Sequence, residues 1–361
     1  MDAREAVERL IVVATSPTAS ADDHDQAATD VFQALKSRGT EVAEAEAILA
    51  RLTAAIRTAP PAGAAMLAGV AGQLVGAGLP GDSLIAAVMQ RIAAAAPLLA
   101  DLRERVVGPD DDEPETTVFE AVAEGGRASS AERTAYLLIN ALYPAATGGL
   151  CLLPSARERF RTLEPLLAVS EDVHEGAHWI AKLLRVLHEE PYVAIEPGSG
   201  IGIQGKMSGI SENFQLNVLL MDVFPSGGFL ARRRVSREAA RIARGQGPQV
   251  ADENIRGAWN LYGWRALTPD GRLPPTDDTQ GTEHWIWNEG TPRDIPMFDD
   301  RRVILIGPAT YQRTWRSQRD YPGLDADLTV ERRLDKDEVT SLLRAMAEAA
   351  RSPRAESESP G

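Results

Sequence analysis

The sequence predicts an α+β protein, with an α-helical N-terminal half followed by a β-rich, mostly antiparallel domain and a C-terminal helix. Three observations lead to this prediction. Residues 1–190 contain alanine-rich segments in which apolar residues recur at helical spacing. Residues 192–330 hold many of the glycines and five of the six tryptophans, a composition typical of short strands and turns. Residues 338–350 return to helical spacing, with Val339, Leu342, Leu343 and Met346 on one side.

These changes in composition divide the chain into four segments. We expect an α-helical domain over residues 1–190, a β-rich domain over 191–334 and a C-terminal helix over 335–351. The last segment, 352–361, is polar and poor in apolar residues, so we expect a disordered tail there.

The helical half is divided where proline and glycine cluster, at Pro60-Pro61, Pro80-Gly81 and Gly108-Pro109. Beyond these breaks we expect helices over Ser130–Leu142, Ser155–Leu167 and Ser170–Glu189. Ser130 and Ser155 are good N-caps for the first two of these helices. Only Ser155 has a glutamate three residues later, so the capping box is expected at that helix.

Four segments of the β-rich half have the pattern of strands: Tyr192–Glu196, Ile201–Ile210, Phe214–Phe224 and Val303–Ile306. In the third, Phe214, Leu216 and Val218 alternate with Gln215 and Asn217, which is the period of a strand. Residues 265–283 have the composition of a long polar loop.

Charge and cysteine content exclude several classes of protein. The 361 residues carry a formal net charge of −14, which argues against a nucleic-acid partner held by clustered Lys and Arg, and against an anionic membrane. The single cysteine, Cys151, excludes an intramolecular disulfide framework and predicts a cytoplasmic protein. The longest apolar stretch, 63–79, is rich in Ala and Gly and has prolines at both ends, so we expect a buried helix rather than a membrane span.

One motif with chemistry stands out. His174-Glu175-Gly176-Ala177-His178 satisfies the pattern H-E-x-x-H. Residues four apart lie on one side of a helix, so two imidazoles at this spacing can bind one Zn²⁺ at about 2.1 Å. The glutamate between them can then take a proton from a zinc-bound water. The sequence therefore predicts His174 and His178 as zinc ligands and Glu175 as the catalytic base.

In these five residues the segment resembles the active-site helix of zincin metallopeptidases. The resemblance implies a zinc-dependent, peptidase-like hydrolase. The longer form of the motif would need Gly at 181 and His at 184, where the chain has Ala181 and Leu184. We therefore expect Glu196 as the third ligand, with Glu189 and His284 as alternatives.

A second function remains open beside the zinc hydrolase. The two histidines can equally belong to an ordinary surface helix, and the chain would then be a non-catalytic interaction module. Its helical half would dock a protein or peptide partner. Its β-rich half contains a dense aromatic set that can stack a ligand or form the core of that half: Trp259, Tyr262, Trp264, Trp285, Trp287, Tyr311 and Trp315.

Two weaker patterns have ordinary structural explanations. Gly200 to Lys206 matches glycine-rich phosphate loops, but no helix start follows and Met207 replaces the Ser or Thr that would bind Mg²⁺. We therefore interpret these glycines as positions of close strand packing. The arginine cluster, residues 232–234 with Arg237, Arg241 and Arg244, is expected to form a solvated surface.

Overall fold

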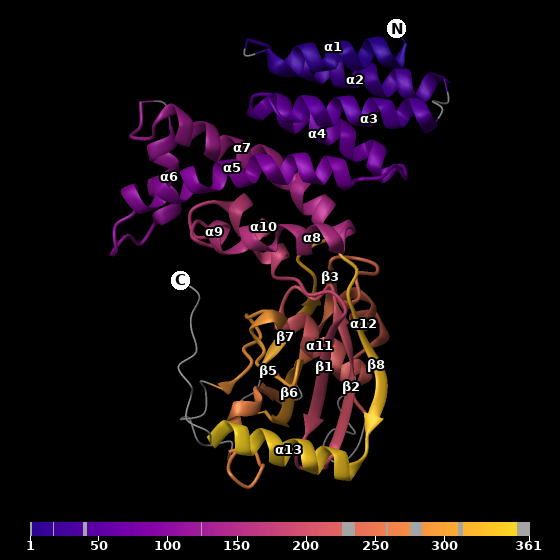
Figure 1. The fold of residues 1–361 in the computed structure, drawn as a ribbon, viewed down its shortest axis with the longest axis vertical. Coiled ribbons are helices and arrows are strands. Elements are labelled where there is room, and N and C mark those ends of the chain that lie inside the picture. The colour runs from indigo at the N-terminus through magenta and orange to yellow at the C-terminus, as the bar shows by residue number, and fades with distance from the viewer. Residues whose placement is uncertain are drawn as a thin grey trace. The chain divides into compact units, whose positions relative to one another are not determined.

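The structure is a computed structural model. It describes residues 2–351 except 17, 39–41, 124, 226–234, 258, 275–283 and 310–312; the segment expected to be a disordered tail, 352–361, lies outside the described residues. The chain forms two compact units, Met1–Arg185 and Val186–Gly361, called unit 1 and unit 2 below. Helices fill unit 1, a mixed sheet begins near residue 190, and a helix closes unit 2, so the predicted fold class is confirmed (Figure 1).

Within the described residues, every regular element of unit 1 is helical. The α-helices are α1 (Ala3–Thr15), α2 (Ala21–Arg38), α3 (Val42–Ile56), α4 (Pro61–Gly76), α5 (Asp82–Val106), α6 (Pro114–Val122), α7 (Ser130–Leu152), α8 (Pro154–Phe160), α9 (Glu164–Ala168) and α10 (Glu175–Leu184), with a 3₁₀ turn η1 (Arg161–Leu163) before α9. Neighbours in sequence pack as pairs, α1 on α2 and α3 on α4. Helix α7 contacts α4, α5 and α10 and therefore connects most of the unit.

Helices α5 and α7 form the apolar centre of unit 1. Both are long and apolar enough to cross a membrane by length and composition, and 56% and 33% of their most apolar windows are buried inside the chain. Leu99, Leu102, Ile139 and Leu142 are among the large side chains of the two helices that are fully buried. The core helices of soluble proteins share these properties.

The capping box predicted at Ser155 lies at a different helix in the structure. The capping box lies at α7, where the Ser129 hydroxyl accepts the Glu132 N–H at 3.3 Å and the Glu132 carboxylate accepts the Ser129 N–H at 2.6 Å. Arg105 also donates to Glu132 at 2.7 Å, and these bonds lower the pKa of Glu132 to about 2. Helix α8 instead begins after Leu153 without a side-chain cap, so the box expected at Ser155 is wrong.

Two expected helices are shorter or interrupted. The segment 155–167 divides into α8, η1 and α9, because Pro165 lacks the N–H that a continuous helix needs and sits in the first turn of α9. The segment 170–189 contains only α10. Residues 170–173 form turns, and Arg185 ends the helix through hydrogen bonds to Ala181 and Lys182.

Unit 2 is built on a six-stranded mixed sheet with the strand order β4-β6-β1-β2-β8, in which β5 also pairs with β6. The strands are β1 (Glu190–Glu196), β2 (Ile201–Ser208), β3 (Val250–Arg256), β4 (Trp259–Tyr262), β5 (Met297–Phe298), β6 (Arg301–Pro308), β7 (Thr314–Gln318) and β8 (Asp327–Leu334). Among the strands of the described segments only β1 and β6 pair in parallel, and β3 and β7 form a separate antiparallel pair. Two 3₁₀ turns, η3 (Trp264–Ala266) and η5 (Pro292–Asp294), follow β4 and precede β5.

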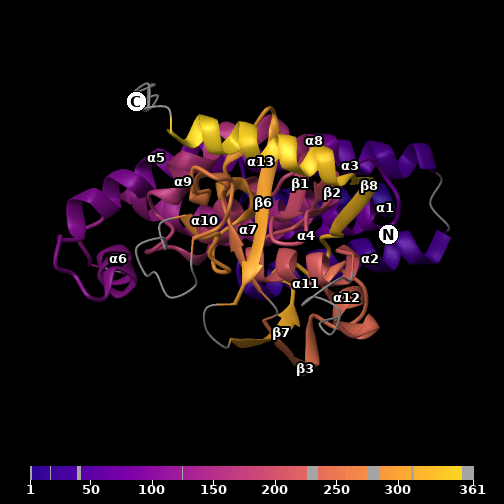
Figure 2. The same cartoon turned by 90° about the horizontal axis from the view of Figure 1, so that it is seen from below.

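Helices cover both faces of this sheet (Figure 2). On one face, Tyr192, Ala194 and Ile304 pack with apolar residues of α11 (Asn213–Val223) and α12 (Arg237–Ala243). On the other face, Val193 and Val303 pack with α13 (Lys336–Arg351), which confirms the expected C-terminal helix. Alternate residues of β1 therefore serve two different cores.

The expected strand over Phe214–Phe224 is wrong, because this segment is helix α11. The alternation of apolar and polar residues that predicted a strand assumes that polar side chains face solvent. Here Asn213, Gln215 and Asn217 are buried at 3% exposure or less, so both sets of residues lie inside the unit. A helix that is buried on all sides lacks the usual amphipathic period.

Candidate functional site

His174 does not lie within a helix but caps one. Its backbone is extended, with φ −151°, and its Nδ1 accepts the Ala177 N–H at 3.3 Å as the N-cap of α10. Because Nδ1 accepts, the ring proton is on Nε2, which donates to the Tyr136 carbonyl oxygen in α7 at 3.0 Å. Both nitrogens that could bind a metal are thus used in bonds to the protein.

The surroundings of His174 fasten α10 to α7. The imidazole is 3% exposed and meets the Tyr136 ring edge-on at a centroid distance of 4.5 Å. Burial lowers the pKa of His174 below its ordinary value of 6.5, although the hydrogen bond to Tyr136 opposes this shift. Two residues further along, a Cβ at Gly176 would lie 3.0 Å from the Tyr143 Cβ, so glycine lets the two helices approach closely.

Glu175 and His178 have different environments from His174. Glu175 is exposed and accepts the Trp179 indole N–H at 3.2 Å, one turn along the same helix. His178 is half-buried, with its ring 5.1 Å from the Trp179 ring. Lys182 lies 5.8 Å from that indole, so these residues form a local row of contacts along α10.

The three residues considered as a third ligand belong to unit 2, whereas both histidines belong to unit 1. Glu196 ends β1 at 4% exposure, and its two carboxylate oxygens accept the N–H groups of Gly198 and Ser199 at 3.0 and 2.8 Å. Glu189 pairs with Lys206 at 3.0 Å, and the His284 carbonyl accepts the Gly263 N–H. In the part of the chain that the structure describes, no group of three or more His, Cys, Asp or Glu residues is arranged to hold a metal ion.

The glycines of the phosphate-like pattern lie in a hairpin. Gly200 has φ +69° in the turn between β1 and β2, and β2 begins at the next residue, so the helix that a phosphate loop requires does not follow. A Cβ at Gly205 would lie 1.9 Å from the Thr329 carbonyl oxygen. These glycines therefore permit close strand packing, as their pattern in the sequence predicts.

The aromatic set divides into core and surface residues. Trp259, Tyr262 and Trp264 are buried, and Trp285 and Trp315 are half-buried. Trp287 alone among the tryptophans of unit 2 is exposed, at 49%. Tyr311 and the arginines at 232–234 lie outside the described residues.

Three buried asparagines take part in hydrogen bonds that hold the chain at Trp287 and just after it. Asn213 donates from Nδ2 to the Trp287 carbonyl oxygen at 2.8 Å, while the Phe214 N–H donates to the Asn288 carbonyl at 3.0 Å. Asn217 donates to the Asn288 side chain at 3.3 Å and accepts the Trp259 indole N–H at 2.8 Å. These bonds, called the asparagine clamp below, join the segment around Trp287 to the N-terminal end of α11.

Trp285 lies beside Trp287, and Met297 and Phe298 belong to a segment that is bonded to Trp264, next to the residue that bonds to His284. We call Trp285, Trp287, Met297 and Phe298 the Trp287 surface; Met297 is 44% exposed and the Trp285 and Trp287 rings are 5.4 Å apart. The two parts of this surface flank one short segment after β4, since Gly263 donates to the His284 carbonyl and the Trp264 indole donates to the Met297 carbonyl. The sequence pattern indicated the tryptophans but not the clamp that positions one of them.

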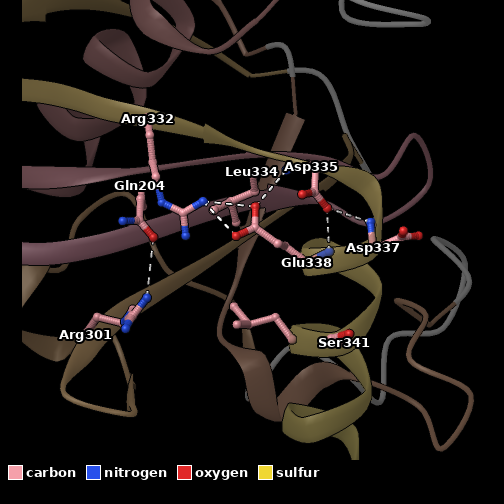
Figure 3. A pocket seen from close by; sticks show the side chains of 9 residues that line it. Gln204, Arg301, Arg332, Leu334, Asp335, Asp337, Glu338 and Ser341 are labelled. Atoms are coloured by element: carbon pink, nitrogen blue, oxygen red, sulfur yellow. Dashed lines mark hydrogen bonds and ion pairs between the residues drawn. The ribbon is translucent and has the colours of Figure 1, made fainter.

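A pocket of about 430 Å³ lies between the sheet and the start of α13 (Figure 3). Its lining comes from β2, β6, β8 and α13: Gln204, Arg301, Arg332, Leu334, Asp335, Asp337, Glu338, Ser341 and Leu342. This volume is within the range of small-molecule sites, about 300–1,000 Å³. No sequence motif indicates these residues, because they come from segments separated by as many as 138 positions.

Comparisons with known proteins leave the site to be interpreted from its own geometry. No family model, no curated protein and no solved structure matches this chain.

Proposed function

We propose that this chain is a non-catalytic interaction protein that binds a peptide segment of a protein partner through the Trp287 surface. The observation that carries the proposal is an exposed indole whose backbone is held by buried asparagines. A tryptophan needed only for the core would be buried, as Trp259 and Trp264 are. A cytoplasmic location, as the single cysteine predicts, belongs to the same proposal.

The clamp supports binding because it lowers the entropy lost on association. A loop that is already ordered loses less conformational freedom when a partner arrives. Burying asparagines is unfavourable unless their amides are hydrogen-bonded, and here Asn213 and Asn217 direct those bonds to the backbone of Trp287 and the side chain of Asn288. The core of unit 2 therefore stabilises one position of a surface residue.

The residue types of the surface favour a polypeptide partner. Tryptophan and methionine are enriched at protein interfaces, and exposed tryptophans supply much of the binding free energy there. The formal net charge of −14 disfavours nucleic acid as the occupant. Aromatic side chains also stack on proline rings, so an extended, proline-containing peptide suits the neighbouring indoles of Trp285 and Trp287.

Selection of a random peptide library on the full chain tests the proposal. We expect enriched peptides whose affinity falls by about tenfold or more in Trp287→Ala, because central interface tryptophans contribute about 2 kcal/mol or more. Val250→Ala is the matched control, since Val250 is similarly exposed at 43% but lies outside the surface. The proposal fails if no peptide is enriched, or if the enriched peptides bind Trp287→Ala as tightly as the wild type.

The zinc-dependent hydrolase remains a prediction of the H-E-x-x-H motif. On that hypothesis Zn²⁺ is held by His174, His178 and Glu196, and Glu175 is the base. The geometry favours the interaction protein over it, because His174 would have to give up either the Ala177 N–H or the Tyr136 carbonyl to bind a metal. Glu196 would likewise have to release the turn that it holds through Gly198 and Ser199.

A further inference from the structure

Of the two arginines that line the pocket beside α13, Arg301 forms the fewer interactions with the described residues. Arg301, at the start of β6, donates one hydrogen bond to Gln204, at the long distance of 3.5 Å. Its ion pair among the residues that the structure describes is with Asp299, 3.9 Å from Nη2, and that side chain is 79% exposed. Within the described residues the guanidinium thus has several N–H groups available on the pocket side.

Among the other charged side chains of the pocket, Arg332 and Glu338 pair with each other and Asp335 accepts backbone N–H groups. Arg332 Nη1 donates to both oxygens of Glu338, at 2.8 and 2.9 Å. Glu338 also accepts the Asp335 N–H, and Asp335 in turn accepts the N–H groups of Asp337 and Glu338. Figure 3 shows these bonds on the helix side, with Arg301 and Gln204 facing them from the sheet.

The first turn of α13 is therefore satisfied by its own residues. The bonds from Asp335 and Arg332 lower the pKa of Glu338, so the carboxylate is charged and already neutralised by Arg332. A ligand gains little by competing for these groups. Arg301 and the apolar side chains of Leu334 and Leu342 are left to contact it.

We propose that this pocket binds a carboxylate that carries an apolar body, with the carboxylate on Arg301 and the apolar body on Leu334 and Leu342. A guanidinium donates two parallel hydrogen bonds to a carboxylate, and the amide of Gln204 lies beside it. The single negative charge matters. The carboxylates of Asp335 and Asp337 line the same pocket, so a doubly charged phosphate is repelled more strongly than a carboxylate.

Two sources can supply such a group: a free carboxylic acid or the C-terminal residue of a peptide. N-acetyl-leucine represents the first. An acetylated Ala-Ala-Leu tripeptide with a free C-terminus represents the second. The matching C-terminal amides of these two compounds keep the apolar body but lack the negative charge. Inorganic phosphate tests whether the pocket prefers a different kind of anion.

Titration of the full chain, followed by NMR, measures each affinity. We expect one or both acids to bind at least about tenfold more tightly than the matching amide, because a charge-assisted hydrogen bond is lost. Arg301→Gln should remove this preference, and Arg301→Lys should keep part of it. Arg333→Gln is the control, because it removes an exposed charge of β8 that does not line the pocket.

The measured affinities distinguish the two sources of the carboxylate and can overturn the proposal. Preference for N-acetyl-leucine alone assigns a free acid, and preference for the tripeptide acid assigns a peptide terminus. Equal binding of acid and amide, tighter binding of phosphate, no binding of any probe, or an Arg301→Gln variant that keeps its preference would each overturn the proposal. Trp287→Ala should leave these affinities unchanged, so this test is independent of the proposed peptide surface.

Discussion

His174 illustrates how a residue that satisfies a catalytic pattern can also cap a helix and join it to another. The motif specifies residue types and spacing, and the chain meets both. It does not specify where the helix begins, and here α10 begins after the first histidine. His174 therefore satisfies a backbone N–H at the start of one helix and a carbonyl on another.

Removing this side chain should weaken unit 1. We expect His174→Ala to lower the free energy of unfolding by about 2–3 kcal/mol, because it removes an N-cap worth about 1 kcal/mol and a buried hydrogen bond worth a similar amount. His174→Asn, which restores a capping side chain, should recover part of the loss. Urea denaturation followed by circular dichroism measures both variants, and a loss below about 0.5 kcal/mol in His174→Ala would contradict this role.

The same residue should make stability depend on pH. Burial lowers the pKa of His174 in the folded chain, so the unfolded chain binds the proton more readily. The contribution of His174 is therefore complete above its ordinary pKa of 6.5 and is lost as the pH falls through the lowered folded value. Charges that face the ring act on this titration, namely Glu115 from α6 and Glu175 from α10.

Thermal unfolding of wild type and His174→Asn over this pH range tests the sign. The difference in stability between the two should shrink as the pH falls below 6.5. A difference that is constant with pH, or one that grows on acidification, would show that His174 is not held neutral in the folded chain.

At the scale of elements, helices and strands with a clear period were predictable, and those with buried polar residues were not. The strand 192–196 is a short, mostly apolar run, the strand 201–208 alternates over most of its length, and the helix 336–351 has a one-sided apolar stripe. Helix α11 does not show the apolar period of a helix, because Asn213, Gln215 and Asn217 are buried and have hydrogen-bond partners there. Periodicity cannot distinguish a polar residue that faces water from one that bonds to a distant loop.

The clamp on α11 gives a prediction for that element. Asn217→Ala should lower the free energy of unfolding by about 2–4 kcal/mol, because the Trp259 indole N–H and the Asn288 side chain lose a partner in the core. Asn140→Ala is the matched control, since Asn140 lies exposed on α7. Hydrogen exchange at residues 285–290 should accelerate in Asn217→Ala alone, and equal protection in both variants would contradict the clamp.

At the scale of the whole molecule, composition predicted the fold class because helix-rich and strand-rich segments use different residues. The candidate sites were less accessible to sequence reasoning. The clamp joins residues 213–217 to 287–288, and the pocket joins residue 204 to residues 301 and 332–342. Such sites form through contacts between segments that are distant in sequence, and the residue types and spacing of a single sequence do not predict these contacts.

The two functional hypotheses make opposite predictions about zinc. If the H-E-x-x-H residues serve helix capping and packing, and unit 2 carries the binding surface, the chain needs no metal. Elemental analysis of untagged protein after incubation with zinc at neutral pH decides between the hypotheses most directly, with His178→Ala as the comparison. We expect no stoichiometric zinc in wild type or variant. About one zinc per wild-type chain, lost in His178→Ala, would contradict the structural role of these histidines and support the metal site.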